Sequence, residues 1–161
     1  MGKSQRNKGR RGEIRARNLL REIYPDAYCS CNQAGSDKQP DVDGTPWWVE
    51  AKEQKTHRIW AAVRQAVDAR DAAGDDRPIV VISHRTNGMT LAVVPMGDFL
   101  DEFGMHALNM SSATCVTGKQ IRWERLVKEY TAVTVKLAGS DPPHSLFVCR
   151  AVDFVEELLK R

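Results

Sequence analysis

The stretch "PDVDGTPWWVEAK", residues 40–52, decides the fold that we expect for this chain. Its Asp-Gly pair followed by proline is a turn signal, and Trp and Val favour strands, so the stretch predicts a β-hairpin over roughly 41–53. An apolar hairpin should bury its side chains, yet this one carries Asp41, Glu50 and Lys52. These charged residues therefore need a partner or a function.

Alternation of side chains along a strand places the charged residues together. From Trp48 to Lys52 the even-numbered residues, including Glu50, share one face, and the odd-numbered residues share the other. Asp41 and Asp43 lie on the preceding strand, close to Glu50 across the turn. We expect the odd-numbered face to be core and Trp48 to form a wall of a cleft.

The carboxylates of this hairpin would repel each other without a positive charge between them. Oxygen ligands favour a hard divalent cation, Mg²⁺ or Mn²⁺. Lys52 would point at the same place and could polarise water or a phosphate oxygen. A metal ion that activates water beside a lysine that stabilises charge is an arrangement for cleaving phosphodiesters.

A further carboxylate comes from the first predicted helix, which runs from about Arg11 to Tyr24. Glu13 lies on the same side of it as the apolar stripe that faces the core. A carboxylate aimed at the core needs a metal ion or a basic group, which the hairpin could supply. The alternative is that Glu13 only favours the helix dipole in the first turn. The stripe comprises Ala16, Leu19, Leu20 and Ile23.

The rest of the chain alternates strands and helices. At 161 residues, with 42% hydrophobic and 28% charged residues, it suits one domain with a core. The pattern predicts an α/β fold, a mixed central β-sheet flanked by helices. The expected helices are 57–74, 97–103, 119–130 and 151–161, and the expected strands are 79–84, 90–96, 131–137 and 145–150.

The charge is concentrated at the N-terminus. Residues 1–21 hold eight basic groups and one acid, a net +7 in a chain of net +3, so the remainder is about −4. A basic arm, which we expect to be flexible over 1–10, suits a polyanion such as nucleic acid. A disordered, solubilising tail is the alternative.

Several other classes are disfavoured. No apolar run is long enough to span a bilayer, so no membrane association is expected, and the N-terminus lacks the apolar region of a secretory signal. Four cysteines without a disulfide framework indicate a reducing, cytoplasmic setting. We expect the cytoplasm of a bacterial, archaeal or virus-infected cell. A zinc site on Cys29 and Cys31 with Cys115 or Cys149 lacks the usual spacing.

The spacing of these motifs resembles that of a known superfamily. The series Gly9–Glu13, Gly35-Ser36, Pro40-Asp41 and Glu50-Ala51-Lys52 looks like the PD-(D/E)xK nucleases, and is most similar to archaeal-type Holliday junction resolvases. The likeness covers roughly residues 8–95. It implies a restriction-endonuclease-like nuclease core over 11–104, and 105–161 would be a C-terminal α/β extension packed on that core.

The resemblance also implies roles for individual residues. Asp41, Glu50 and the Ala51 carbonyl would hold Mg²⁺, for which Mn²⁺ could substitute, Lys52 would be the catalytic lysine, and Glu13 the helix-borne acid and a possible further ligand. Ser36 matches a serine in the loop before the PD motif, and Gln65 a polar residue close to the site. The expected DNA-binding residues are Lys8, Arg10, Arg11, Arg15, Ser36, Lys55 and Gln65.

Two classes of function remain open. The first is a Mg²⁺-dependent DNA endonuclease acting on branched DNA, such as a four-way junction, as a homodimer; a restriction- or repair-type nuclease on linear DNA is its variant. The second is a non-catalytic nucleic-acid-binding module, although a pure binding protein has no reason to hold clustered acids beside a polyanion. The apolar residues considered for pairing two copies are Trp60, Phe99, Phe103 and the segment 147–154.

Overall fold

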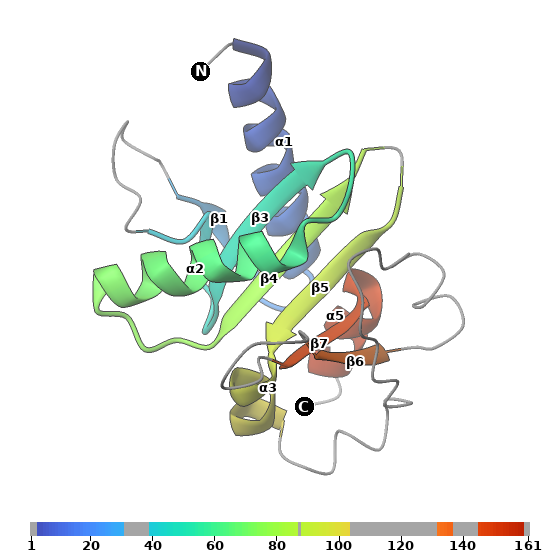
Figure 1. Ribbon diagram of the computed structural model, residues 1–161. Coiled ribbons are helices and arrows are strands. Elements are labelled where there is room, and N and C mark those ends of the chain that lie inside the picture. The colour runs from blue at the N-terminus through green and yellow to red at the C-terminus, as the bar shows by residue number, and fades with distance from the viewer. Residues whose placement is uncertain (1–2, 31–38, 87, 104–131, 137–144, 160–161) are drawn as a thin grey trace.

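A mixed sheet of seven strands in the order β1-β2-β3-β4-β5-β7-β6 forms the centre of the protein (Figure 1). The computed structural model describes residues 3–30, 39–86, 88–103, 132–136 and 145–159. The strands β3 and β4 are parallel, and the other neighbours are antiparallel. This confirms the expected α/β class with a mixed sheet flanked by helices.

The bounds of the elements follow the expected pattern closely in the middle of the chain. The strands are β1 (Tyr28–Cys29), β2 (Val42–Asp43), β3 (Trp48–Gln54), β4 (Ile79–Arg85), β5 (Thr90–Pro95), β6 (Ala132–Lys136) and β7 (Ser145–Arg150). The helices are α1 (Lys3–Leu20), α2 (Ile59–Ala73), α3 (Met96–Phe103) and α5 (Ala151–Leu159).

The hairpin expected from residues 41–53 is confirmed as β2 and β3, which pair through Val42 and Val49. Gly44 occupies its turn with φ of +76°, and a Cβ there would lie 2.6 Å from the carbonyl oxygen of Asp26. Only glycine tolerates both the left-handed backbone and this close approach. The turn therefore fixes which residues of the two strands face each other.

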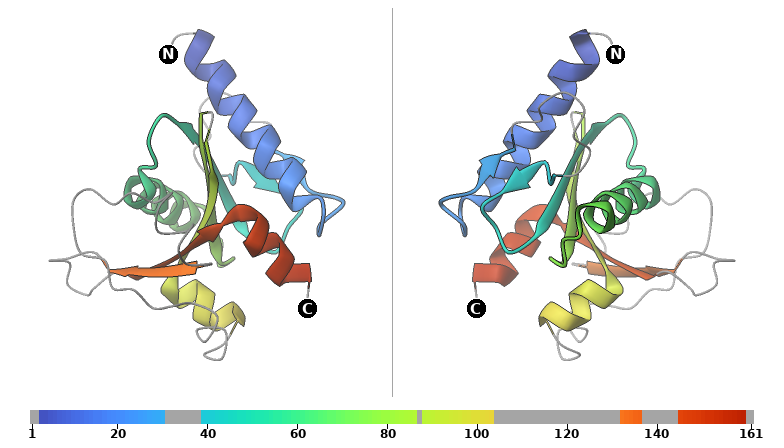
Figure 2. Two further views of the ribbon diagram at one scale, coloured as in Figure 1. Left: turned by 90° about the vertical axis from the view of Figure 1, so that its right-hand side faces the viewer. Right: turned by 90° about the vertical axis from the view of Figure 1, so that its left-hand side faces the viewer.

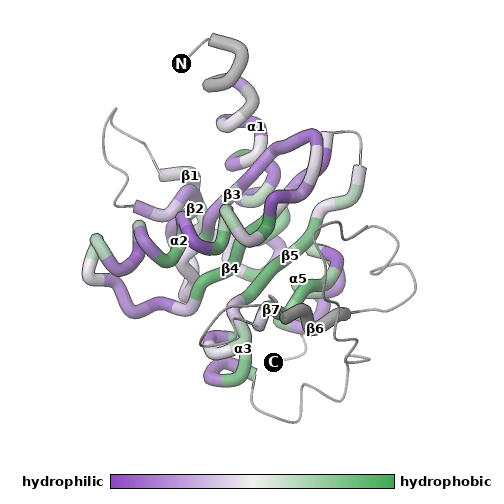
Figure 3. The backbone as a smooth tube through the Cα atoms, viewed as in Figure 1, coloured by the Kyte–Doolittle hydropathy of each residue, from purple (hydrophilic) through white to green (hydrophobic). Residues whose placement is uncertain are grey.

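The helices form a layer on each face of the sheet, with α2 on one side and α1, α3 and α5 on the other (Figure 2). Apolar residues follow the central strands, whereas the end of β3 and the loop after it are hydrophilic (Figure 3). Trp47 packs against Phe103 and Phe154, as expected of a core residue. Trp48 is 1% exposed in the cluster under α2, so it is a core residue rather than a wall of a cleft.

The first helix differs from its expected bounds. It begins at Lys3 rather than near Arg11, so residues 3–10, expected as a flexible arm, are a helical continuation of α1. It ends at Leu20, and hydrogen-bonded turns continue to Tyr24. Local pattern gave no reason to extend the helix, because its first two turns contain no apolar residue that could pack on the sheet.

The C-terminal segment is part of the central sheet and not an extension packed on a finished core. The strand β7 pairs with β5 over Leu91–Pro95, and α5 contributes Phe154 and Leu158 to the same buried cluster as α1. The expected boundary near residue 104 stays a prediction. The helix expected over 119–130 lies outside the described residues.

The aromatic residues considered for pairing two copies are core residues. Phe99 stacks on Phe147 with ring centroids 3.9 Å apart, and Phe103 and Phe154 are buried beside them. Trp60 is half-buried against the cluster under α2. The buried phenylalanines therefore offer no pairing surface, whereas Trp60 is partly exposed and Val152 is 50% exposed.

Across the parts of the chain that the structure describes, none of the helices combines the length and the apolar character needed to cross a membrane. Cys29 and Cys149 are buried, free thiols. The other two cysteines that were considered for zinc, Cys31 and Cys115, lie outside the described residues.

Candidate functional site

The hairpin brings Asp41 close to Glu50. Val42 pairs with Val49, Asp41 precedes Val42 and Glu50 follows Val49, and the Asp41 carboxylate is near enough to raise the pKa of Glu50. The Asp41 N–H donates to the Val49 carbonyl, and the Ala51 N–H donates to Oδ2 of Asp41, each at 2.8 Å. Just before β2, the Asp41 carboxylate thus accepts a hydrogen bond from the backbone of β3. The two hydrogen bonds fix the orientation of this side chain.

Glu50 and Lys52 form an ion pair along β3, between Nζ of the lysine and Oε1 of the glutamate. They are two residues apart, so they share one face of the strand, as the alternation predicted. Glu50 is only 5% exposed. A buried carboxylate would be costly without such a partner.

Glu13 approaches this pair from α1, on the other side of the sheet. The approach depends on Gly12, because a Cβ there would lie 3.3 Å from both Cβ and N of Glu53. The side chain of Glu13 is 15% exposed, and Arg10 Nη1 lies 3.3 Å from its Oε2. The prediction that Glu13 faces inward is therefore confirmed.

The pKa values of Glu50, Asp41 and Glu13 are all raised in this site. Burial raises the pKa of Glu50 to about 7, with a further rise from the nearby Asp41 carboxylate and an opposing effect of Lys52. Burial raises the pKa of Asp41, against the hydrogen bond from Ala51 and the charge of Lys52. Burial and then Asp41 raise the pKa of Glu13, against Arg10. The three acids thus share a poorly solvated site that favours an added positive charge.

The oxygen donors of this site fit a hard divalent cation. In the part of the chain that the structure describes, no group of three or more His, Cys, Asp or Glu residues is arranged to hold a metal ion. Mg²⁺, however, commonly binds through one or two carboxylates and takes its other ligands from water and substrate. Asp41 and Glu50 are two such carboxylates, and the Ala51 carbonyl lies between Glu50 and Lys52 in sequence. The donor chemistry therefore suits Mg²⁺ or Mn²⁺.

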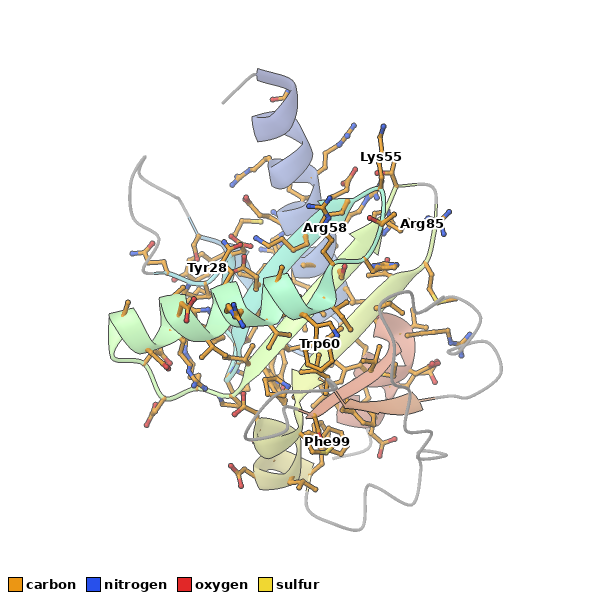
Figure 4. The ribbon with its side chains drawn as sticks, in the orientation of Figure 1. Tyr28, Lys55, Arg58, Trp60, Arg85 and Phe99 are labelled. Carbon is orange, nitrogen blue, oxygen red and sulfur yellow. The ribbon has the colours of Figure 1, made fainter. Side chains whose placement is uncertain are left out.

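Basic side chains gather at the end of the sheet where β3 and β4 finish. Because these strands are parallel, the segments that follow them leave from the same edge. Lys55 and Arg58 follow β3, Arg85 ends β4, and all three are exposed at this end (Figure 4). The Thr86 N–H donates to the Gln54 carbonyl at 3.0 Å, which ties the two segments together.

The structure places the expected DNA-binding residues in different surroundings. Arg10, Arg11 and Arg15 are exposed on α1, but each contacts an acid: Arg10 pairs with Glu13, and the other two with Glu53. Lys55 is exposed in the basic group. Lys8 lies on α1 by its backbone, Gln65 is exposed on α2, and Ser36 lies outside the described residues.

Sequence reasoning missed two contacts near the site. Glu53 was not singled out, although its side chain is 2% exposed beneath two arginines of α1. Ser83, opposite Lys52 on β4, is 1% exposed, and its Oγ lies 2.9 Å from Nδ1 of His57. Alternation along "VEAKEQ" could have placed Glu53 on the face of Val49 and Ala51, where a charge is unexpected.

Comparisons of the chain with protein-family models, with curated proteins and with solved structures find no match.

Proposed function

We propose that this protein is a Mg²⁺-dependent endonuclease that hydrolyses phosphodiester bonds of DNA, on a restriction-endonuclease-like core. The observation that carries the proposal is the pair of carboxylates at the start of the hairpin: half-buried Asp41 lies beside buried Glu50, which forms an ion pair with Lys52. Clustered acids beside a lysine favour phosphodiester chemistry, because the acids hold a metal ion and the lysine stabilises charge on phosphate.

Each residue has a role that follows from its surroundings. Asp41 and Glu50, with the Ala51 carbonyl, would hold the cation, which supplies Lewis acidity toward water and phosphate oxygen. Asp41 is already oriented by the Ala51 N–H. Lys52 neutralises Glu50 in the free protein and would stabilise negative charge that develops on phosphate. Glu13 adds a carboxylate that could orient water or extend the ligand set.

The surrounding charge supports a polyanionic substrate. The exposed basic residues Lys55, Arg58 and Arg85 lie at the end of the sheet to which β3 carries Lys52, and α1 adds further arginines there (Figure 4). Phosphate contacts by such residues supply most of the affinity for DNA, without reading sequence. DNA is thus the substrate class that the proposal takes.

The finer part of the proposal is branched DNA cut by a homodimer. A four-way junction needs two cuts at symmetry-related positions, and a chain with one such site supplies one cut. Closed dimers are the commonest oligomers, and they place two identical sites a fixed distance apart. Sedimentation at micromolar concentration, with and without a four-way junction, tests this: a monomer in both cases would contradict it.

A non-catalytic nucleic-acid-binding module is the second candidate. One observation favours it: Lys52 already neutralises Glu50, so part of the acidic cluster is balanced without a metal ion. The two candidates differ in turnover. A binding module would hold DNA at the basic end and release it uncut, with no dependence on Mg²⁺.

The test is cleavage of linear duplex, flapped and four-way-junction DNA, with Mg²⁺ or with EDTA. Asp41→Ala and Glu50→Ala should abolish cleavage and leave DNA binding intact or tighter, since each removes a negative charge near phosphate. Lys52→Ala should lower the rate by orders of magnitude. Paired symmetric nicks in the junction would support a resolvase, and equal cutting of linear duplex a restriction- or repair-type nuclease.

Asp43→Asn is the matched control for these variants. Asp43 is a carboxylate of the same hairpin, but it pairs with Arg77 at 2.8 Å and lies outside the cluster. We expect this variant to cut at close to the wild-type rate. Wild-type rates in all three cluster variants would disprove the assigned site, and a wild-type protein that binds but never cuts would support the binding module.

A further inference from the structure

Glu53 is a buried carboxylate of β3, and three residues of α1 lie against it: Arg11, Gly12 and Arg15. Its side chain is 2% exposed; Arg11 Nη2 lies 3.3 Å from its Oε1, and Arg15 Nη1 lies 3.8 Å from its Oε2. Gly12, between these arginines on the helix, is so close that an added Cβ would meet the Cβ of Glu53 at 3.3 Å. At Glu53, helix and strand therefore meet both through charge and through close packing.

The packing of α1 on β3 leads up to this contact. Leu20 and Ala16 lie in the same buried cluster as Val49 and Ala51, and Gly12 is the next residue of that helical row. The side chains shrink along the row from leucine to alanine to glycine, and at Gly12 the absence of a side chain lets the helix approach Glu53 closely. Glu53 is the next residue of β3 on that face.

We infer that Glu53 is a positioning residue for the nuclease reaction: by holding Arg11 and Arg15 around Gly12, it fixes α1 so that Glu13 reaches the Asp41–Glu50 pair. This rests on the proposed function. Glu13 is the residue after Gly12, so a small movement of the helix on Glu53 moves its carboxylate by a similar amount. Displacements of about 1 Å at a reacting centre cost on the order of a hundredfold in rate.

A general structural role would need no charge at this position. An uncharged residue at position 53 need not lower stability, because the cost of desolvating the buried Glu53 carboxylate offsets its attraction to the two arginines. An uncharged residue at this position would lose the two ion pairs, to Arg11 and to Arg15, that hold α1 against β3. Arg11 and Arg15 remain 62% and 51% exposed, so they could also contact phosphate while Glu53 holds them in place.

The test is a double-mutant cycle on cleavage with Mg²⁺. Glu53→Gln, which keeps the shape and removes the charge, should lower kcat about tenfold or more with little change in KM. In the Glu13→Gln background the same substitution should cost almost nothing, because its effect passes through Glu13. Equal losses in both backgrounds would overturn the inference, since they would show a role that does not depend on Glu13.

Gly12→Ala supplies a second variant, and Gly9→Ala is its matched control. Both are glycines of α1, but a Cβ at Gly9 meets nothing within 4 Å. Gly12→Ala should lower kcat and Gly9→Ala should leave it unchanged. The inference is overturned if the two variants behave alike.

A readout that does not depend on cleavage separates this inference from the proposed function. The nuclear Overhauser effect between the Gly12 α-protons and the Glu53 side chain should be present in the wild-type protein and weakened in the Arg11→Gln, Arg15→Gln double variant. Its absence in the wild type, or its persistence in the double variant, overturns the inference. A wild-type protein that shows the contact and cuts no DNA would instead overturn the proposed function.

Discussion

Glu50 is a charged residue in surroundings that disfavour a charge. It lies on a strand with apolar neighbours, it is 5% exposed, and the Asp41 carboxylate lies near it. The strand places it there because the even-numbered residues of β3 share a face, whatever their polarity. Lys52 offsets part of the cost. The pKa of Glu50 is still raised to about 7, so Lys52 does not offset the whole cost of burying this charge.

The first prediction concerns the pH dependence of stability. Folding raises the pKa of Glu50 to about 7, so the folded state holds this proton more tightly than the unfolded chain does. The stabilising effect of the proton is present below the ordinary pKa of a glutamate and is lost as the pH rises through about 7. The free energy of unfolding should therefore fall over that window, and Glu50→Gln should flatten the fall.

Urea denaturation between pH 5 and 8 measures this effect. Each unit of pKa shift corresponds to about 1.4 kcal/mol, so Glu50→Gln should gain on the order of 1 kcal/mol or more over the wild type at pH 8. Glu156→Gln, at an exposed position of α5, is the control and should change little. Mg²⁺ should stabilise the wild type and not Glu50→Gln. Parallel pH profiles for wild type and Glu50→Gln would contradict the assignment.

At the scale of elements, the two halves of α1 differ in their contacts and in their charge. Its C-terminal half packs on the sheet through Ala16 and Leu20, and its N-terminal half carries basic residues. The two glycines of the helix lie in different surroundings. Gly9 has open space around it, whereas Gly12 touches Glu53 on β3.

This difference predicts opposite effects of the same substitution on stability. Gly9→Ala should raise the free energy of unfolding by about 0.5–1 kcal/mol, because glycine is a poor helix former. Gly12→Ala gains the same propensity but overpacks the contact with Glu53, which costs about 1–3 kcal/mol. We expect Gly12→Ala to be at least about 1 kcal/mol less stable than Gly9→Ala. Thermal unfolding of both proteins measures this, and equal melting temperatures would contradict it.

At the scale of the whole molecule, the parallel pair β3–β4 concentrates basic side chains at one end of the sheet. Two segments that follow parallel strands leave from the same end of the sheet. Lys55, Arg58 and Arg85 therefore lie at one end, although up to 30 residues separate them in sequence. Acidic side chains are more frequent elsewhere, for example on α3 and α5. The distribution gives the protein one end rich in basic side chains, and under the proposed function this end would face the phosphates of DNA.

The last prediction follows from this distribution. Replacing Lys55, Arg58 and Arg85 by Ala should weaken DNA binding and flatten its salt dependence, by about 0.9 in the slope of log affinity against log salt for each phosphate that the variant no longer neutralises. Arg70→Gln, near the other end of α2, is the control. An unchanged slope in the triple variant would show that DNA binds elsewhere.

Deleting residues 1–10, with four basic side chains, tests in the same way whether the start of α1 contacts DNA or only solubilises the protein.

The sequence by itself determined the local structure around the site. The turn at Gly44, the alternation of β3 and the helical stripe of α1 are short-range properties, since each depends on residues that are neighbours in the chain. They were enough to predict the hairpin, the shared face of Glu50 and Lys52, and the inward direction of Glu13. The sequence also predicted β6, β7 and α5 as elements, but not their place in the fold.

Only the tertiary structure decided how these elements meet. Three features depend on contacts between distant residues: β7 pairs with β5, α1 packs closely on Glu53 at Gly12, and Arg58 and Arg85 lie at the same end of the sheet as Lys55. Periodicity carries no information on which strands pair, because any apolar strand can satisfy another's hydrogen bonds and bury its face. For Glu53, local alternation could indicate the face of the strand, but not the two arginines that cover it, because these come from a helix more than 35 residues earlier in the chain.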